Sequence, residues 1–193
     1  MNKIFIASNN AHKIGEIRNI LRDNGIDAEL LCPKDFNDRS EPVENGKSFK
    51  ENAFIKAEYY FNKYHYPTLA DDSGICIDYL NGLPGIHSSR FYGEYDYHEK
   101  NQKVLRMMKN VKNRKACFYD VICYIEDKNK ISYFEGINPG EIALEEKGNE
   151  GFGYDPIFLI PEYNKTEAEL GDAFKNENSH RAKALKKWAE YVR

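Results

Sequence analysis

The sequence lacks the features that mark disulfide-rich, zinc-binding, membrane-spanning and secreted proteins. Its four cysteines form no CxxC pair and lie in apolar, strand-like runs, so we expect buried reduced thiols rather than disulfides or zinc ligands. No apolar run approaches the roughly 18 residues that indicate a membrane helix. The N-terminus lacks the long apolar core of a signal peptide. We therefore expect a cytoplasmic protein with no membrane partner.

A surplus of basic residues is also missing. The chain holds 28 Lys and Arg against 31 Asp and Glu, a net charge of −3, which argues against a nucleic-acid partner. Residues 179–193 are an exception, because five Lys or Arg stand there against one Glu. An anionic ligand would find its most favourable field near that segment.

Repeats, linkers and low-complexity segments are absent, and 193 residues suit one domain, so we predict a single domain over 1–193. Apolar periodicity predicts strands at 3–8, 27–32, 115–126 and 131–136. It predicts helices after Asn10, after Ser48, over 96–111 and at the end of the chain. Because 115–126 and 131–136 resemble an antiparallel hairpin, we expect an α/β fold with a mixed sheet.

The most unusual stretch runs from residue 69 to residue 90. Asp71 and Asp72 follow an apolar run and precede Ser73 and Gly74. We expect the strand to end there, which would place both carboxylates at a chain reversal where they reach a cation or a phosphate. The alternative is an acidic, solvated turn.

Two cationic segments lie N-terminal to this stretch. A strand, a loop and a helix surround Ser8, Asn10 and Lys13, an arrangement that favours anion binding at the helix N-terminus. It is not a GxxxxGK[ST] phosphate loop, and an Asn-capped helix is the alternative. Lys56 lies beside the apolar stripe of the next helix, where it is either a solvated lysine or a cation near Asp72.

Two further segments follow the predicted hairpin. Phe152 stands between Gly151 and Gly153, so its ring is either an open stacking platform for a planar base or a plug in the core. Arg181 falls in the first turn of the terminal helix, where a cation opposes the helix dipole. A cation placed against its local preference indicates function.

Five motifs, in this order, resemble those of the non-standard purine nucleoside triphosphate pyrophosphatases, the inosine/xanthosine triphosphate pyrophosphatase family. They are SNNAHK at 8–13, ADDSG at 70–74, PG at 84–85 with SSR at 88–90, GFGYDP at 151–156, and SHR at 179–181. The resemblance implies a long curved mixed β-sheet flanked by helices, two lobes around a central cleft, and a homodimer. It also implies a Mg²⁺ cofactor and hydrolysis of ITP, dITP or XTP to the monophosphate and pyrophosphate, which cleanses the nucleotide pool.

The resemblance also implies roles for individual residues. Glu44 and Asp72 would hold the metal, and Asp72 would accept the proton of a Mg²⁺-activated water. His87 departs from the family pattern, which has an aromatic ring there. Asn9 and His12 replace residues that are usually small. The implied triphosphate contacts are Ser8, Asn9, Asn10, Ala11, His12, Lys13, Lys56 and Ser73, and the implied base pocket is Phe152, Gly153, Tyr154, Asp155, Lys175, His180 and Arg181.

This assignment agrees with the chemistry of the residues. Hard carboxylates suit Mg²⁺, which takes one or two protein ligands, and lysines neutralise phosphoryl oxygens. The pattern leaves open whether Asp71 or Asp72 is the base, because adjacent strand residues point to opposite faces and neighbouring carboxylates titrate together. A regulator that binds 6-oxopurine nucleotides without cleaving them is one alternative, and a pyrimidine triphosphate substrate is another.

Overall fold

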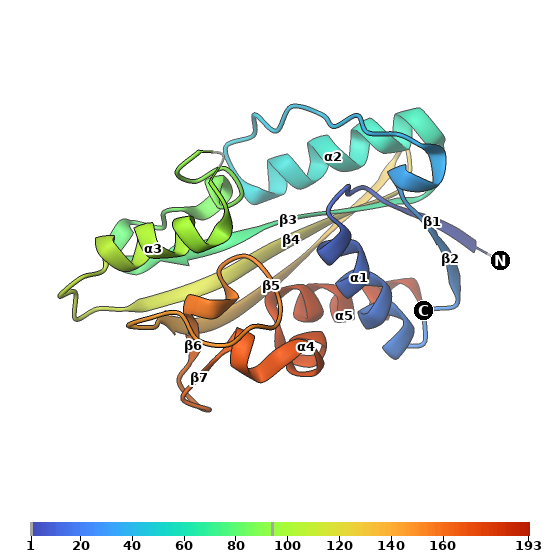
Figure 1. Ribbon diagram of the computed structural model, residues 1–193. Coiled ribbons are helices and arrows are strands. Elements are labelled where there is room, and N and C mark those ends of the chain that lie inside the picture. Colours follow the sequence, from blue (N-terminus) through green and yellow to red (C-terminus); the bar gives the residue numbers. More distant parts are fainter. Residues whose placement is uncertain (1, 94) are drawn as a thin grey trace. The chain divides into compact units, whose positions relative to one another are not determined.

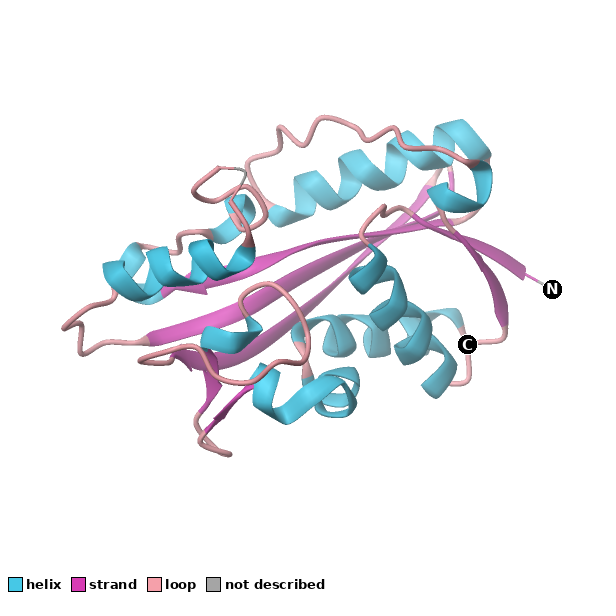
Figure 2. Ribbon diagram, in the orientation of Figure 1, coloured by secondary structure: helices cyan, strands magenta, loops and turns pink. Residues whose placement is uncertain are grey.

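A computed structural model describes residues 2–93 and 95–193, and its helices and strands are drawn in Figures 1 and 2. The helices are α1 Ala11–Asp23, α2 Phe49–Tyr64, α3 Tyr97–Met107, α4 Glu167–Asn178 and α5 His180–Val192. The strands are β1 Asn2–Ile6, β2 Ala28–Leu31, β3 Thr68–Ile77, β4 Lys115–Asp127, β5 Lys130–Ile142, β6 Phe158–Ile160 and β7 Lys165–Thr166. Single 3₁₀ turns span Pro33–Phe36, Asp78–Leu80, Gly85–His87 and Asp155–Ile157.

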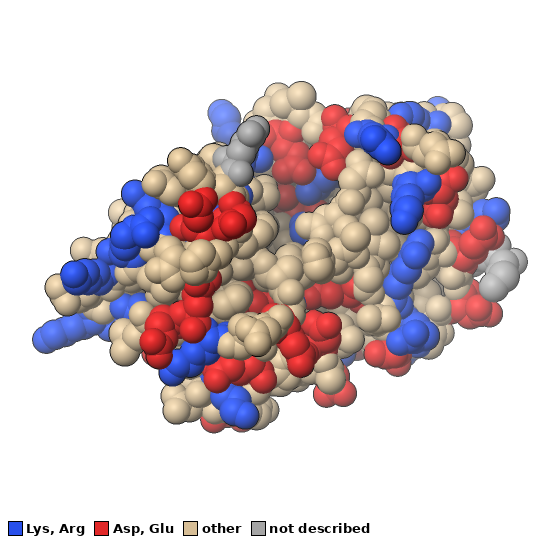
Figure 3. Space-filling model, viewed as in Figure 1, with Lys and Arg blue, Asp and Glu red and all other residues tan. Residues whose placement is uncertain are grey.

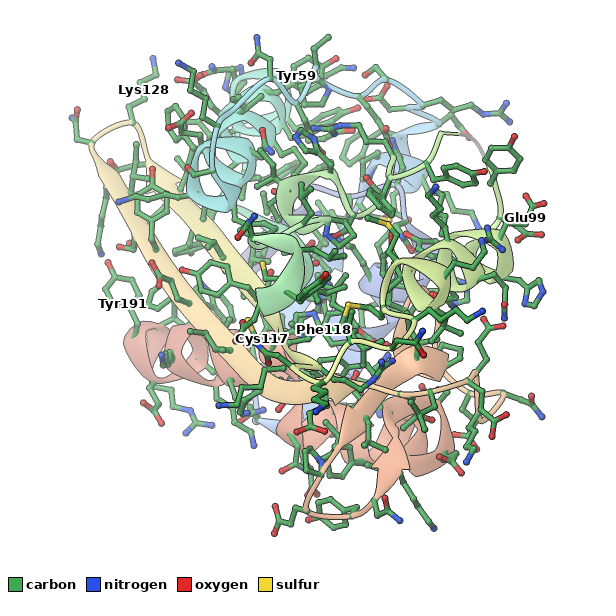
Figure 4. The ribbon with its side chains drawn as sticks, turned by 90° about the vertical axis from the view of Figure 1, so that its left-hand side faces the viewer. Tyr59, Glu99, Cys117, Phe118, Lys128 and Tyr191 are labelled. Atoms are coloured by element: carbon green, nitrogen blue, oxygen red, sulfur yellow. The ribbon has the colours of Figure 1, made fainter. Side chains whose placement is uncertain are left out.

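The strands form a seven-stranded sheet in the order β2-β1-β3-β4-β5-β6-β7. Strand β1 runs parallel to β2 and β3, whereas β5, β6 and β7 pair in antiparallel fashion. Two residues join the neighbouring strands β4 and β5, so these form the predicted hairpin, with Lys128 at its tip (Figure 4). The prediction of an α/β fold with a mixed sheet is therefore confirmed.

The predicted chain reversal after Asp72 is wrong. Strand β3 continues through Ser73 and Gly74 to Ile77. Gly74 is needed for close packing, because a Cβ atom there would lie 2.3 Å from the carbonyl oxygen of Gly85 and 2.4 Å from Oγ of Ser88. A glycine required by a neighbouring backbone has the same sequence signal as a glycine required by a turn.

The prediction also missed or shortened several elements. Helix α4 and strands β6 and β7 were not predicted, and β5 extends beyond residues 131–136 to Ile142. The segment of β5 beyond Gly136 contains Pro139 and Gly140, which are depleted in strands, so its sequence favoured a loop.

The chain divides into two compact units. The first comprises residues 1–72, 120–136 and 181–193, and the second comprises 73–119 and 137–180. The chain passes repeatedly from one unit to the other, so neither is a continuous segment. The single domain expected from the sequence remains a prediction.

In the first unit, helices cover both faces of the sheet (Figure 1). On one face, α1 and α5 bury Ile17, Leu21 and Trp188 against a strand residue, Leu69. On the other face, α2 buries Ala53 and Ala57. Truncating a fully buried Trp such as Trp188 to Ala typically costs about 3–5 kcal/mol, so α5 contributes heavily to this core.

The second unit has its own apolar core. Helix α3 contributes Val104 and its C-cap residue Met108, both fully buried, and Phe118 and Phe158 meet with their ring centroids 4.4 Å apart. Helix α4 begins with a capping box in which Thr166 and Glu169 satisfy each other's backbone N–H groups. The glycine-rich segment 148–156, between β5 and β6, is tied to α4, because the N–H of Glu150 donates a hydrogen bond to the carbonyl oxygen of Ala168 (3.3 Å).

Acidic and basic side chains are interspersed on the face drawn in Figure 3. Within the described residues, no helix is both long enough and apolar enough to span a membrane.

Candidate active site

The loop between β1 and α1 brings the first predicted phosphate-binding residues to the surface of the first unit. Asn10 caps α1, because its Oδ1 accepts hydrogen bonds from the N–H groups of His12 (3.0 Å) and Lys13 (3.2 Å). Ser8 Oγ accepts a hydrogen bond from the N–H of Asn10 (3.1 Å). A phosphate group that used the N–H groups of His12 and Lys13 would have to replace the Asn10 side chain.

The other predicted triphosphate contacts of this loop are Asn9, Ala11 and the side chain of His12. The Asn9 amide donates a hydrogen bond to the carbonyl oxygen of Ser40 (3.4 Å), which ties the loop to the segment before α2. Ala11 and His12 are exposed at the start of α1. The loop is therefore anchored at Asn9 and Asn10 and is open to solvent on its outer side.

Asp71 and Asp72 occupy opposite faces of β3. Leu69 packs with the core of α1 and α5, while Ala70 packs with the core of α2. Because side chains alternate along a strand, Asp71 lies on the α1 and α5 face and Asp72 lies on the α2 face. Two adjacent carboxylates are thereby placed in different surroundings.

Asp71 is the buried anion of a charge network. Its Oδ2 lies 2.9 Å from Nζ of Lys13, which extends from α1, and 3.1 Å from Nη2 of Arg181, which extends from α5. The guanidinium of Arg181 also pairs with Glu16. Burial raises the pKa of Asp71, but Lys13 and Arg181 together outweigh it and hold this pKa well below its usual range. Asp71 is therefore ionised at neutral pH.

Asp72 belongs to a second, more open network. Its Oδ1 lies 3.0 Å from Nζ of Lys56, and Lys56 Nζ also lies 3.0 Å from Oε1 of Glu44. Asn52 donates a hydrogen bond to the other carboxylate oxygen (3.3 Å). Burial raises the pKa of Asp72, and although Lys56 opposes this, the pKa stays above its usual value. A raised pKa brings a carboxylate closer to neutral pH, where a general base is most effective.

Lys56 is held by this network as a cation. Burial lowers the pKa of Lys56, but Asp72, Asp71 and Glu44 outweigh burial and raise it above its usual value. The sequence left open a solvated lysine or a cation near Asp72, and the structure places Lys56 in the second arrangement.

The donor set fits a divalent cation. Glu44 and Asp72 each place a carboxylate oxygen 3.0 Å from one nitrogen, so both reach a common cationic position. In the described parts of the chain, no three His, Cys, Asp or Glu side chains are grouped to hold a metal by themselves. Two carboxylates with water completing the shell is the arrangement typical of Mg²⁺.

The second unit contains the remaining predicted residues, around the turn at 151–155. Nζ of Lys175 lies 2.7 Å from Oδ2 of Asp155 and 4.7 Å from the ring centre of Phe152. The N–H of Phe152 donates a hydrogen bond to Asp155 (2.8 Å). Gly151 is required there, because its φ is +75° and a Cβ atom would lie 2.2 Å from Oδ2 of Asp155. Phe152 is half-buried. The ammonium of Lys175 lies over the ring that the resemblance assigns to the base pocket.

Two other predicted residues of this pocket have structural contacts. Tyr154 is buried in the core, and its hydroxyl donates a hydrogen bond to the carbonyl oxygen of Ser88 (2.8 Å). His180 is buried, and its ring stacks on Phe118 with the centroids 4.8 Å apart. Of the predicted base pocket, Phe152, Asp155 and Lys175 are in direct contact.

The predicted residues therefore fall into two groups, one in each unit. The first unit holds Ser8, Asn9, Asn10, Ala11, His12, Lys13, Glu44, Lys56, Asp72 and Arg181. The second unit holds Ser73, Phe152, Gly153, Tyr154, Asp155, Lys175 and His180.

Sequence reasoning missed three members of the first group. Glu16 is the second partner of Arg181, Asn52 holds Asp72, and Asp120 lies buried in β4. The signal for Asp120 was present, because a carboxylate within the apolar alternation of β4 is rarely placed in a core. Asn52 likewise interrupts the buried stripe of α2.

Comparison with known proteins places these features in a family. Residues 4–191 match the model of the Ham1 family. The dITP/XTP pyrophosphatase of Clostridium perfringens is 45% identical over 97% of this chain and 95% of its own length. A HAM1 protein from Coxiella burnetii has the same fold, with a TM-score of 0.90 and 38% identity over 100% of this chain and 98% of that one. The Staphylococcus aureus Ham1 protein gives a TM-score of 0.88 and 34% identity over 99% and 98% of the two chains.

Proposed function

Because the chain belongs to the Ham1 family, we propose that it hydrolyses the non-standard purine nucleoside triphosphates ITP, dITP and XTP to the nucleoside monophosphate and pyrophosphate. The Clostridium perfringens relative, a dITP/XTP pyrophosphatase that aligns with 97% of this chain, supports this proposal. The observation that carries it is the position of Lys56, whose ammonium joins the carboxylates of Glu44 and Asp72 at 3.0 Å each. Anionic phosphates and a divalent cation both find partners at that point.

Hydrolysis requires that charge on the phosphoryl oxygens be neutralised and that a water lose its proton. Lys13 and Lys56 supply the positive charge, and Asp72 accepts the proton. Asp71 keeps Arg181 paired and does not take part in proton transfer, because the cations around it hold its pKa low. Glu44 and Asp72 would hold Mg²⁺, which supplies charge neutralisation and lowers the pKa of a bound water.

The selection of the purine base of the substrate depends on residues of the second unit. Lys175 carries only donors, which match an acceptor at purine position 6, the oxo group of hypoxanthine and xanthine. Adenine has an amino donor there, and a site built around a polar contact can reject the wrong partner by a factor on the order of 10⁴. Both expected donors are ion-paired, Arg181 with Asp71 and Glu16 and Lys175 with Asp155, but only Lys175 also lies over the ring of Phe152, the proposed stacking residue. We therefore assign the reading of position 6 to Lys175 first.

A substrate panel tests this function. Pyrophosphate release is measured for ITP, dITP, XTP, ATP, GTP, CTP and UTP, and the first three should have kcat/KM values far above that of ATP. Nucleotide binding without pyrophosphate release would instead indicate a regulator. Preference for a pyrimidine triphosphate would replace the substrate class.

Two substitutions separate the contributions to base choice. Lys175→Met should reduce kcat/KM for ITP much more than for ATP, because it removes the donor that reads the 6-oxo group. Phe152→Ala should weaken all nucleotides alike, because stacking does not depend on the edge of the base. Equal losses for ITP and ATP in Lys175→Met would make Lys175 a structural residue.

The assembly and the location remain predictions. Light scattering at micromolar concentration should give twice the 22.5 kDa chain mass if the protein is the expected homodimer. A mass of one chain would contradict it. The cytoplasmic location is tested by fractionation of cells that express the protein.

A further inference from the structure

Asp120 is a buried acid that the proposed chemistry does not use. It lies in the middle of β4 with no exposed surface, and neither carboxyl oxygen has a hydrogen-bond partner among the described residues. An ionised carboxylate at such a place would lose its hydration without a hydrogen bond to replace it. Burial, reinforced by the negative charge of Asp71, accordingly raises the pKa of Asp120 to about 8. At neutral pH the group is mainly a neutral acid.

Asp120 belongs to the Asp71 face of the sheet. Ile122, two residues along β4, packs with the core of α1 and α5, and alternation places Asp120 on the same face. Asp72 lies on the opposite face. The charged groups that act on Asp120 directly are Asp71 of β3, Arg181 of α5, Lys13 of α1 and, more weakly, Asp72, and Glu16 of α1 acts on it through its ion pair with Arg181.

Within the ion pairs of this network, the charges balance while Asp120 is neutral. Lys13 and Arg181 carry two positive charges, and Asp71 and Glu16 carry two negative ones. An ionised Asp120 would add an uncompensated negative charge beside Asp71. It would then bind Lys13 and Arg181 more tightly and would repel any anion that approaches Lys13.

Anion binding and the proton of Asp120 are therefore linked. A phosphate group that draws Lys13 away leaves Asp71 with less positive charge, and this makes ionisation of Asp120 still less favourable. By thermodynamic reciprocity, the neutral form of Asp120 must favour anion binding to the same extent.

We propose that Asp120 is a positioning residue whose proton keeps the Asp71 network free of excess negative charge and so leaves Lys13 available to the phosphate groups of a polyphosphate ligand. The identity of the nucleotide rests on the proposed function, but the coupling itself does not, because any polyphosphate that recruits Lys13 is subject to it. No bond is made or broken by Asp120 in this role.

The test uses inorganic tripolyphosphate as the probe. Its dissociation constant is measured by calorimetry at pH 7 and pH 9 for the wild-type protein and for Asp120→Asn, which is neutral at both. With a group that titrates at about 8, the ratio of the wild-type to the variant dissociation constant should rise about tenfold between the two pH values. The variant comparison removes the titration of the probe itself. A ratio that is equal at pH 7 and pH 9 would overturn the proposal.

Two further variants keep the result interpretable. Asp127→Asn removes a carboxylate from the exposed end of the same strand, and its ratio to wild type should not change with pH. If Asp120→Asn does not fold, Asp120→Ser provides a smaller neutral side chain with the same expected result. A merely structural role of Asp120 would shift affinity or stability by the same factor at both pH values.

The second arm of the experiment uses ITP as the ligand. The KM for ITP of the wild-type protein should rise relative to that of Asp120→Asn between pH 7 and pH 9. If ITP is not hydrolysed at all, the proposed function fails while the tripolyphosphate result still decides the role of Asp120. If ITP is hydrolysed and the tripolyphosphate ratio is constant, only the role of Asp120 is lost.

Discussion

Each face of β3 in the first unit carries one aspartate, and the two aspartates have different surroundings. On one face, Asp71 is enclosed by Lys13 and Arg181, and its side chain is 1% exposed. On the other face, Asp72 shares Lys56 with Glu44, whose side chain is 28% exposed. The first network is closed to solvent around Asp71 and Arg181, and its Lys13 side chain is 18% exposed. The second is open at Glu44, where a ligand can reach it.

This difference follows from what covers each face. Helices α1 and α5 bring cations onto the Asp71 face, whereas α2 brings Lys56 and Asn52 onto the Asp72 face. The pKa of Asp71 is therefore lowered and that of Asp72 is raised, although the two are neighbours in sequence. A carboxylate held by strong cations serves the structure, and one with a raised pKa can take a proton.

The largest effect should come from Asp71→Asn. Removing this charge breaks the buried ion pair between Asp71 and the guanidinium of Arg181, and breaking a buried ion pair typically costs about 3–5 kcal/mol. We expect the free energy of unfolding in urea to fall by about that amount. Asp72→Asn is the matched control, and its free energy of unfolding should fall much less. Equal losses for the two variants would remove the distinction between the faces.

Asp72→Asn should affect turnover instead. As the proton acceptor, Asp72 should contribute at least about two orders of magnitude to kcat for ITP, the scale typical of a general base. Circular dichroism and the urea midpoint should remain close to those of the wild-type protein. A folded Asp72→Asn variant with wild-type kcat would transfer the role of base to another group.

The pH dependence of stability should differ in sign between the faces. The folded-state pKa of Asp71 is lowered from 3.8, so its contribution is present above pH 4 and is lost as the pH falls below that value. The folded-state pKa of Asp72 is raised from 3.8, so its contribution is present below pH 4 and is lost as the pH rises through the folded value. Urea unfolding of wild type, Asp71→Asn and Asp72→Asn from pH 3 to pH 7 measures both. Profiles of the same slope would contradict the assigned environments.

Glu44→Gln should have the smallest effect, confined to the metal requirement. Losing one of two carboxylate ligands should raise the Mg²⁺ concentration for half-maximal ITP hydrolysis several-fold, while kcat at saturating Mg²⁺ changes less. Glu41→Gln, in the exposed part of the same loop, is the control for loss of charge and should leave the Mg²⁺ requirement unchanged. An unchanged requirement in Glu44→Gln would remove Glu44 from the ligand set.

Much of the fold was readable from local patterns. The stripe of Ala53 and Ala57 predicted α2, and alternation along 115–126 predicted β4, because burial of one face imposes a period that the sequence repeats. Helix α4 was not predicted because Gly171 interrupts it with a φ of +80°. Segments whose conformation depends on distant contacts, such as the end of β5, carry no such period.

The candidate site was predictable in part. Sequence motifs predicted that Lys13, Lys56 and Asp72 act at one site. The structure brings Lys56 and Asp72 within 3.0 Å of each other, whereas Lys13 pairs with Asp71 on the other face of β3. The alternation along β4 marks Asp120 as an unusual buried acid. Its place near Asp71, and the pairing of Glu16 with Arg181, could not be inferred, because these residues come from elements far apart in the chain.

The sequence by itself determined which residue types are present, the order of the strongly periodic helices and strands, and the alternation that sends Asp71 and Asp72 to opposite faces. Only the tertiary structure decided which of the two is a buried counter-ion and which remains open to chemistry. The reason is that the pKa of a carboxyl group depends on burial and on charges within a few ångströms, and helices α1, α2 and α5 bring those charges from distant parts of the chain.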